Sequence, residues 1–181
     1  MGNLYPVLVQ ETLPGDNFHI TPEMLIRFAP MTFPIMHRID ATIHFFYVPN
    51  RILWKNWTKF LAMEKVGGVP YSPLYLQGTE EKLFNVRVGS IYDYLGLPID
   101  PKIKEKINAF PLLAYMKVFN QYYQDQNNDS SYETLRNALE TIYEKSGGRV
   151  SPSDLNENIN KYDELPLFKR AWQHDYLTSV S

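Results

Sequence analysis

Apolar and polar residues alternate with a period of two between His37 and Val48, which predicts a β-strand. One face of this strand is apolar throughout, whereas the other is polar from Arg38 to His44 and turns apolar at its end. That end is therefore expected to be covered on both sides. We predict a core strand that Pro49 ends, with buried positions at Ile39, Ile43, Phe45 and Tyr47.

Beyond Pro49 the apolar period lengthens to about three and a half residues, which predicts an amphipathic helix capped by Asn50 and reaching Glu64. Its apolar stripe consists of Leu53, Trp54, Trp57, Phe60 and Leu61. Rings that stack on sugars or bases stand in the open, whereas a stripe shared with leucines is typical of a core or subunit interface. The pattern therefore favours a core or interface helix over a ligand platform.

Four further helices are predicted from spacing and end signals. The segment SIYDYL carries a capping pair at Ser90 and Asp93 and is closed by Gly96. Helical spacing runs from Leu112 to Tyr123 behind Pro111. Another helix is expected after a capping box at residues 130 and 133, and a shorter one after residue 151.

The remaining signals are those of strands and loops. Residues 4–9 have the pattern of a strand, and the sequence from Leu13 to Asp16 has Pro then Gly at the centre of a type II turn. Residues 66–88 are punctuated by Gly and Pro and are predicted to form a surface loop that packs through Tyr71 and Leu74. So few strands leave sheet edges open, so a sheet would need more chain or another chain to close it.

Composition narrows the classes of function. The 181 residues are 44% hydrophobic and 21% charged, which fits one globular domain. The formal net charge of -2 gives no basic footprint for nucleic acid, and the absence of cysteine excludes disulfides and thiolate chemistry. We find neither a long apolar run nor a secretory leader and expect no membrane contact. The aromatic content of 14%, including 13 Tyr, suits either a core or subunit interfaces.

Candidate chemistry is sparse. Four histidines, His19, His37, His44 and His174, could serve a metal or acid-base site. His37 and His44 point to opposite faces of the predicted strand, and His44 beside Asp40 is more typical of a structural hydrogen bond. No phosphate-binding or nucleophile motif occurs, and the paired acids lie in polar surroundings. We therefore predict no catalytic residue, metal or cofactor.

Several ordered blocks of sequence resemble one known family. HFFYVPNRILWKNWTKF, preceded by LPGDNFHI and PMTFPIMHRID, is similar to the major capsid protein of the Microviridae, especially its gokushovirus-like branch. GSIYDYLGLP, LLAYMKVFNQYYQDQN and KRAWQHDYLTS resemble successive segments of the same family in the same order, and residues 129–164 match least. Family members are longer at both ends, so the chain is expected to correspond to an N-terminal portion.

The resemblance implies a mainly β fold with α insertions: an incomplete antiparallel β jelly roll of viral capsid type. Residues 1–49 would supply its first strands, 50–167 a helix- and loop-rich insertion, and 168–181 the return toward the barrel. The implied function is that of a structural subunit, not an enzyme, in a T=1 icosahedral phage capsid around a single-stranded DNA genome. Assembly in the host bacterial cytoplasm is implied, and contacts with other virion or scaffolding proteins and with packaged DNA stay open.

Such a shell is a homo-oligomer, and Tyr-rich helices suit contacts between its subunits. We therefore expect Tyr122 and Tyr123 to lie at or near a subunit contact. Two alternatives remain: a carbohydrate- or ligand-binding β-sandwich module, which glycan binding would support, and a cupin-type enzyme, which a stoichiometric metal would support.

Overall fold

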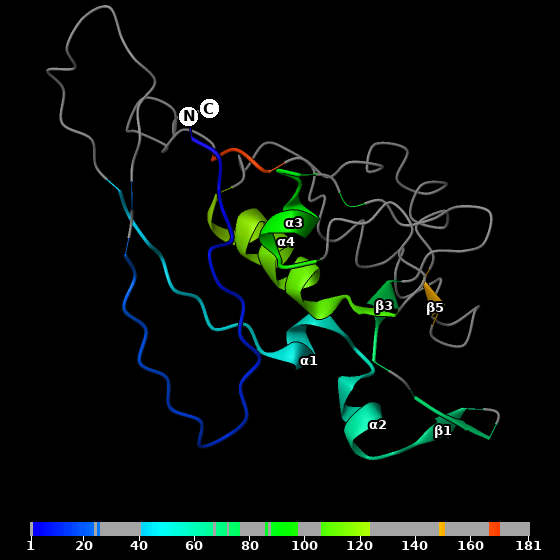
Figure 1. The fold of residues 1–181 in the computed structure, drawn as a ribbon. Coiled ribbons are helices and arrows are strands. Elements are labelled where there is room, and N and C mark those ends of the chain that lie inside the picture. The colour runs from blue at the N-terminus through cyan, green and yellow to red at the C-terminus, as the bar shows by residue number, and fades with distance from the viewer. Residues whose placement is uncertain are drawn as a thin grey trace, which may run out of the picture. The chain divides into compact units, whose positions relative to one another are not determined.

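The computed structural model describes residues 2–23, 25, 41–66, 68–71, 73–76, 86, 88–97, 106–123, 149–150 and 167–170 (Figure 1). The chain divides into two compact units. The first comprises Met1–Val9 and Tyr47–Ser181, and the second is Gln10–Phe46. Each unit is described by itself below.

The first unit contains all the helices and strands that the structure assigns. In chain order they are α1 (Asn50–Leu53), α2 (Trp57–Leu61), β1 (Lys65–Val66), β2 (Val69–Pro70), β3 (Tyr75–Leu76), α3 (Ile91–Tyr94), β4 (Ile107–Asn108), α4 (Phe110–Tyr122) and β5 (Arg149–Val150). β1 and β2 form an antiparallel hairpin, and β3 lies between antiparallel β4 and parallel β5. The predicted loop over residues 66–88 therefore contains short strands, while Leu74 and Tyr71 do pack as expected: Leu74 is buried and Tyr71 half-buried.

Helix α4 is the longest element in the described part of the chain, and the predicted helix over Leu112–Tyr123 is confirmed with an earlier start. Pro111 occupies its first turn, and the Asn108 side chain accepts a hydrogen bond from the Phe110 N–H at 3.0 Å. Its buried face consists of Phe110, Leu112, Leu113 and Met116. Because α1 packs against α4 (Figure 1), the hydrophobic core lies around this helix.

The prediction of a single helix, capped by Asn50 and reaching Glu64, is wrong because the chain forms two short helices there. Pro49, not Asn50, is the N-cap of α1, and Trp54 leaves the helix with extended dihedral angles (φ -139°, ψ 121°). The break aims Trp54 into the core, where it is fully buried, and Leu61 is consequently 61% exposed rather than core-facing. Tertiary burial of one large ring has overridden the helical period.

The predicted ends of the SIYDYL helix are confirmed in α3. The Ser90 hydroxyl accepts from the Asp93 N–H, and the Asp93 carboxylate accepts from the Gly89 N–H at 2.8 Å. At the other end Gly96 has a φ of +85°, and the N–H groups of Gly96 and Leu97 donate to the carbonyls of Asp93 and Tyr92. These bonds form a Schellman motif, in which glycine is the residue that adopts positive φ without strain.

The second unit contains the predicted turn but no assigned strand among its described residues. The Asp16 N–H donates to the Leu13 carbonyl at 3.0 Å, and Gly15 has a φ of +98°, as a type II turn requires. The described residues on either side form no strand, and neither do residues 5–9 of the first unit. Residues 2–4 of the first unit do pair with residues 168–170, through one antiparallel bridge between Asn3 and Lys169.

The predicted core strand is not formed in the described part of residues 37–48. Ile43, Phe45 and Tyr47 are 38%, 70% and 82% exposed, and Ile39 lies outside the described residues. An alternating segment becomes half-buried only when neighbouring strands and a second layer cover one face, and no described residue supplies them. The helices predicted after residues 130 and 151 also lie outside the described residues.

Candidate functional site

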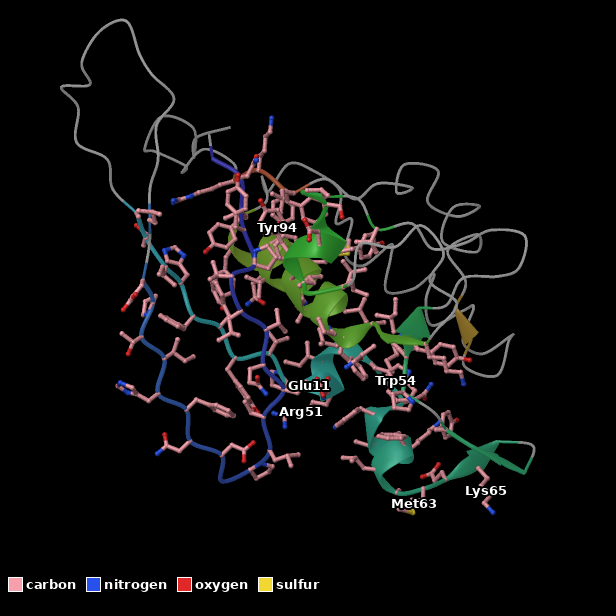
Figure 2. All side chains as sticks on the ribbon, viewed as in Figure 1. Glu11, Arg51, Trp54, Met63, Lys65 and Tyr94 are labelled. Atoms are coloured by element: carbon pink, nitrogen blue, oxygen red, sulfur yellow. The ribbon has the colours of Figure 1, made fainter. Side chains whose placement is uncertain are left out.

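A cluster of aromatic rings surrounds Trp54, which is labelled in Figure 2, in the core of the first unit. The Trp54 ring centroid lies 6.0 Å from that of Phe60, 6.4 Å from Tyr71 and 6.3 Å from Phe110. Trp57 joins the cluster through an edge-to-face contact of 5.7 Å with Phe110. Such contacts stabilise beyond the area they bury. Since Trp54 is fully buried, it cannot act as an open ligand platform in this conformation.

A second cluster joins the N-terminal segment to a segment far along the chain. The Tyr115 hydroxyl donates to the Leu4 carbonyl at 2.8 Å and accepts from the Phe168 N–H at 3.2 Å. The Phe168 ring stacks on Tyr115 at 5.6 Å and lies 4.5 Å from Phe119. We call this group the Tyr115 junction and define it as Leu4, Tyr115, Phe119 and Phe168.

Burial raises the pKa of three described tyrosines of this unit. Burial raises the pKa of Tyr115 to about 12, with the Phe168 N–H opposing the shift. Burial also raises the pKa of Tyr92, well beyond its usual range. The pKa of Tyr123 is raised by burial and lowered by the nearby charge of Arg170. All of these groups therefore stay protonated near neutral pH, as hydrogen-bonding tyrosines do.

The tyrosines predicted at a subunit contact lie together at the C-terminal end of α4. Tyr122 is 59% exposed, and Tyr123, the C-cap residue, is half-buried. The spacing that predicted them is confirmed as helical, while their role in a contact stays a prediction. Tyr122 has the more accessible ring of the pair.

The histidines are not gathered into a site in the part of the chain that the structure describes. His19 lies 3.4 Å from the Thr21 hydroxyl, and His44 has an edge contact with Phe46 at 6.2 Å. His37 and His174 lie outside the described residues, as does Asp40. Among the residues that were placed, no group of His, Asp or Glu is suited to hold a metal ion, and no helix could cross a membrane.

The Tyr115 junction was not predicted, although Tyr115 lies within the helix that was predicted from Leu112 to Tyr123. Its partners lie 111 and 53 residues away along the chain. Helical periodicity reports only which face of a helix a residue occupies, not what a hydroxyl on that face will meet. Nothing in the local spacing therefore distinguishes Tyr115 from a purely hydrophobic position.

Comparison of the sequence with known proteins finds one family and several relatives. Residues 1–180 match the family described as "Capsid protein (F protein)". The chain is 33% identical over 190 residues to capsid protein VP1 of Chlamydia phage 1, covering 99% of the chain and 30% of that protein. Corresponding identities are 33% for VP1 of Bdellovibrio phage phiMH2K, with 98% and 30% covered, and 25% for VP1 of Spiroplasma virus 4, with 99% and 31% covered. The chain thus spans about a third of the length of these curated relatives.

Proposed function

The chain belongs to the capsid protein (F protein) family of phages, and on this premise we propose that it serves as part of a structural subunit of an icosahedral capsid. The match over residues 1–180 is the observation that carries the proposal. In this proposal many copies tile a T=1 shell around a single-stranded DNA genome, assembled in the cytoplasm of a bacterial host. The subunit performs no reaction of its own.

The fold proposed for the complete subunit is a β jelly roll with a large insertion. Residues 1–49 supply early barrel strands, 50–167 the insertion, and 168–181 the return to the barrel. Two features support this division. The buried core consists of residues from Leu53 to Met116, all inside the proposed insertion, and Ile43, Phe45 and Tyr47 expose apolar surface that a barrel would cover.

Tyr122 and Tyr123 are proposed to lie at or near a contact between subunits. The support is the position of both at the end of α4 and the 59% exposure of Tyr122. Tyrosine combines a large apolar ring with a polar tip, which favours it at partly hydrated interfaces. A structure of the shell in which both rings were buried within their own subunit would refute this placement.

The test of the function is assembly by the complete open reading frame that encodes the chain. After expression in a bacterium, we expect closed particles of uniform size in electron micrographs and a fast-sedimenting peak that contains peptides of residues 1–181. Tyr122→Ala should reduce the particle yield more than Tyr94→Ala, a matched change at another partly exposed tyrosine of the same unit. Exclusively monomeric protein that binds glycans would overturn the proposal and support the β-sandwich binding module instead.

A further inference from the structure

The ends of the described first unit are held together by a short antiparallel ladder with one irregularity. Asn3 and Lys169 face each other, the Leu4 N–H donates to the Phe168 carbonyl at 2.8 Å, and the Arg170 N–H donates to the Gly2 carbonyl at 3.2 Å. In a regular antiparallel ladder a residue pair such as Leu4 and Phe168 exchanges two hydrogen bonds. The second bond, from the Phe168 N–H to the Leu4 carbonyl, would continue this ladder.

The Tyr115 hydroxyl takes the place of that second bond. It accepts the Phe168 N–H at 3.2 Å and donates its own proton to the Leu4 carbonyl at 2.8 Å. A phenol can do both at once, so neither backbone group loses its partner. The ladder is therefore interrupted at this pair and is bonded at the same point to helix α4.

Ring contacts make the arrangement specific to one alignment of the two segments. The Phe168 ring stacks on Tyr115 with an interplanar angle of 18° and lies 4.5 Å from Phe119, one turn further along α4. A slip of one residue would turn Phe168 to the opposite face of the ladder and remove both ring contacts. A slip would also leave the hydroxyl facing a different pair of backbone groups.

We infer that Tyr115 is a positioning residue whose hydroxyl selects the register in which residues 2–4 pair with residues 168–170. Residues 2–4 and 168–170 are thereby held together at one fixed place beside α4. The register itself does not depend on the proposed function, whereas its consequence does: in a capsid subunit, a fixed junction would set where the insertion joins the barrel.

Engineered disulfides measure the register directly, because the natural chain has no cysteine. Asn3→Cys with Lys169→Cys joins a directly opposed pair that lies between hydrogen-bonded neighbours, a spacing short enough for a disulfide. Asn3→Cys with Arg170→Cys is the off-register control, because successive residues of a strand point to opposite faces. We expect rapid oxidation of the first pair only. Adding Tyr115→Phe should slow that oxidation about three- to tenfold, the effect of losing a net hydrogen bond.

Amide hydrogen exchange separates positioning from general stability. In Tyr115→Phe the ring remains and the hydroxyl is lost, so the Leu4, Phe168 and Arg170 amides should exchange about three- to tenfold faster. The Leu113 and Tyr123 amides, which donate within α4, should keep their protection. Tyr75→Phe removes a hydroxyl from β3 of the same unit and should leave the exchange of all of these amides unchanged.

Each result decides the inference. Unchanged cross-linking and unchanged exchange at Phe168 in Tyr115→Phe would overturn it, and so would equal loss of protection in α4, since Tyr115 would then be a general core residue. Particle assembly by the complete Tyr115→Phe protein is read separately. Normal particles despite a shifted register would show that assembly does not depend on this register. The register assignment and the proposed function would both still hold.

Discussion

Regularly spaced apolar residues are buried in the first unit of the chain and exposed in the second. In the first unit Trp54, Ile91 and Leu113 are fully buried, and their neighbours form a continuous core around α4. In the second unit Ile43 is 38% exposed and Phe45 is 70% exposed, although both belong to the clear alternating pattern that begins at His37. Hydrophobic patterning alone therefore does not decide which residues this chain buries.

The difference arises because helical and alternating apolar patterns need different structural partners before their apolar faces are buried. A helical stripe is buried when one further element packs on it. Helices α1, α3 and α4 contribute to one core, and all of them lie between Asn50 and Tyr122. An alternating strand needs neighbours for its backbone and a second layer for its apolar face. The apolar residues of the helical unit are thus buried by elements that are near in sequence, whereas burial of residues 41–47 requires partners that the described residues do not supply.

A charge placed at an exposed apolar position of residues 41–47 tests this difference between the units most directly. In the 181-residue chain Phe45→Asp should change the unfolding free energy by less than about 0.5 kcal/mol, because Phe45 is largely exposed there. In the complete capsid protein the same residue should be buried, and an unpaired charge there should cost more than about 2 kcal/mol and abolish particles. Particle yield by sedimentation checks this, with Phe45→Leu as the control that still assembles. Normal particles from Phe45→Asp would refute the placement of this strand in a barrel.

The helical unit should respond to truncation in the 181-residue chain itself. Trp54→Ala removes the ring that contacts Phe60, Tyr71 and Phe110 and should lower the unfolding free energy by about 3–5 kcal/mol. Leu61→Ala, at a position 61% exposed, should change it by less than about 0.5 kcal/mol. Urea unfolding followed by tryptophan fluorescence or circular dichroism measures both. Similar costs for the two variants would mean that the ring cluster is not the core.

Alkaline titration tests the buried tyrosines of the same unit. The pKa of Tyr115 is raised from 10.0 to about 12 by burial, so folding favours its neutral form. Its contribution to stability is therefore complete below about pH 10 and is lost as the pH rises through about 12. Tyrosinate absorbance of the native chain should show a late-ionising fraction, and Tyr115→Phe should reduce that fraction. Ionisation of all tyrosines together near pH 10 would contradict the burial of Tyr115.

Local signals in the sequence predicted the local parts of the structure well. The Ser90 and Asp93 capping pair, the turn at Gly15 and the helix behind Pro111 each depend on groups a few residues apart, and each is confirmed. The family was also predicted, from ordered sequence blocks rather than from chemistry, and the family match confirms it. The role of this chain in a capsid stays a proposal.

The parts that sequence reasoning missed depend on contacts across long separations. The break at Trp54 exists because the ring is buried against Phe110 of α4, a partner that helical spacing cannot indicate. The Tyr115 junction likewise joins Leu4 to Phe168 through a hydroxyl whose role no period encodes. The predicted contact of Tyr122 and Tyr123 and the jelly roll itself concern other copies or more chain, and they stay predictions.

The smallest expected effects come from the C-terminal ends of α2 and α3, which share one motif but differ in one residue. At the end of α2 the N–H groups of Met63 and Glu64 donate to the carbonyls of Phe60 and Lys59, so Met63 occupies the position that Gly96 holds after α3. Met63 has a φ of +54°, is 82% exposed and projects beyond the end of α2 (Figure 2). A side chain in this left-handed conformation costs about 1 kcal/mol relative to glycine.

The two positions should therefore respond to opposite substitutions with opposite signs. Met63→Gly should raise the unfolding free energy by about 1 kcal/mol, and Gly96→Ala should lower it by about the same amount. The space around Gly96 is open, with no atom within 4 Å of an added Cβ, so its cost would come from the backbone angle alone. Chemical denaturation of both variants measures the pair. If Met63→Gly instead destabilised the chain, the exposed Met63 side chain would have to be making a stabilising contact. The packed part of the first unit would then include the end of α2.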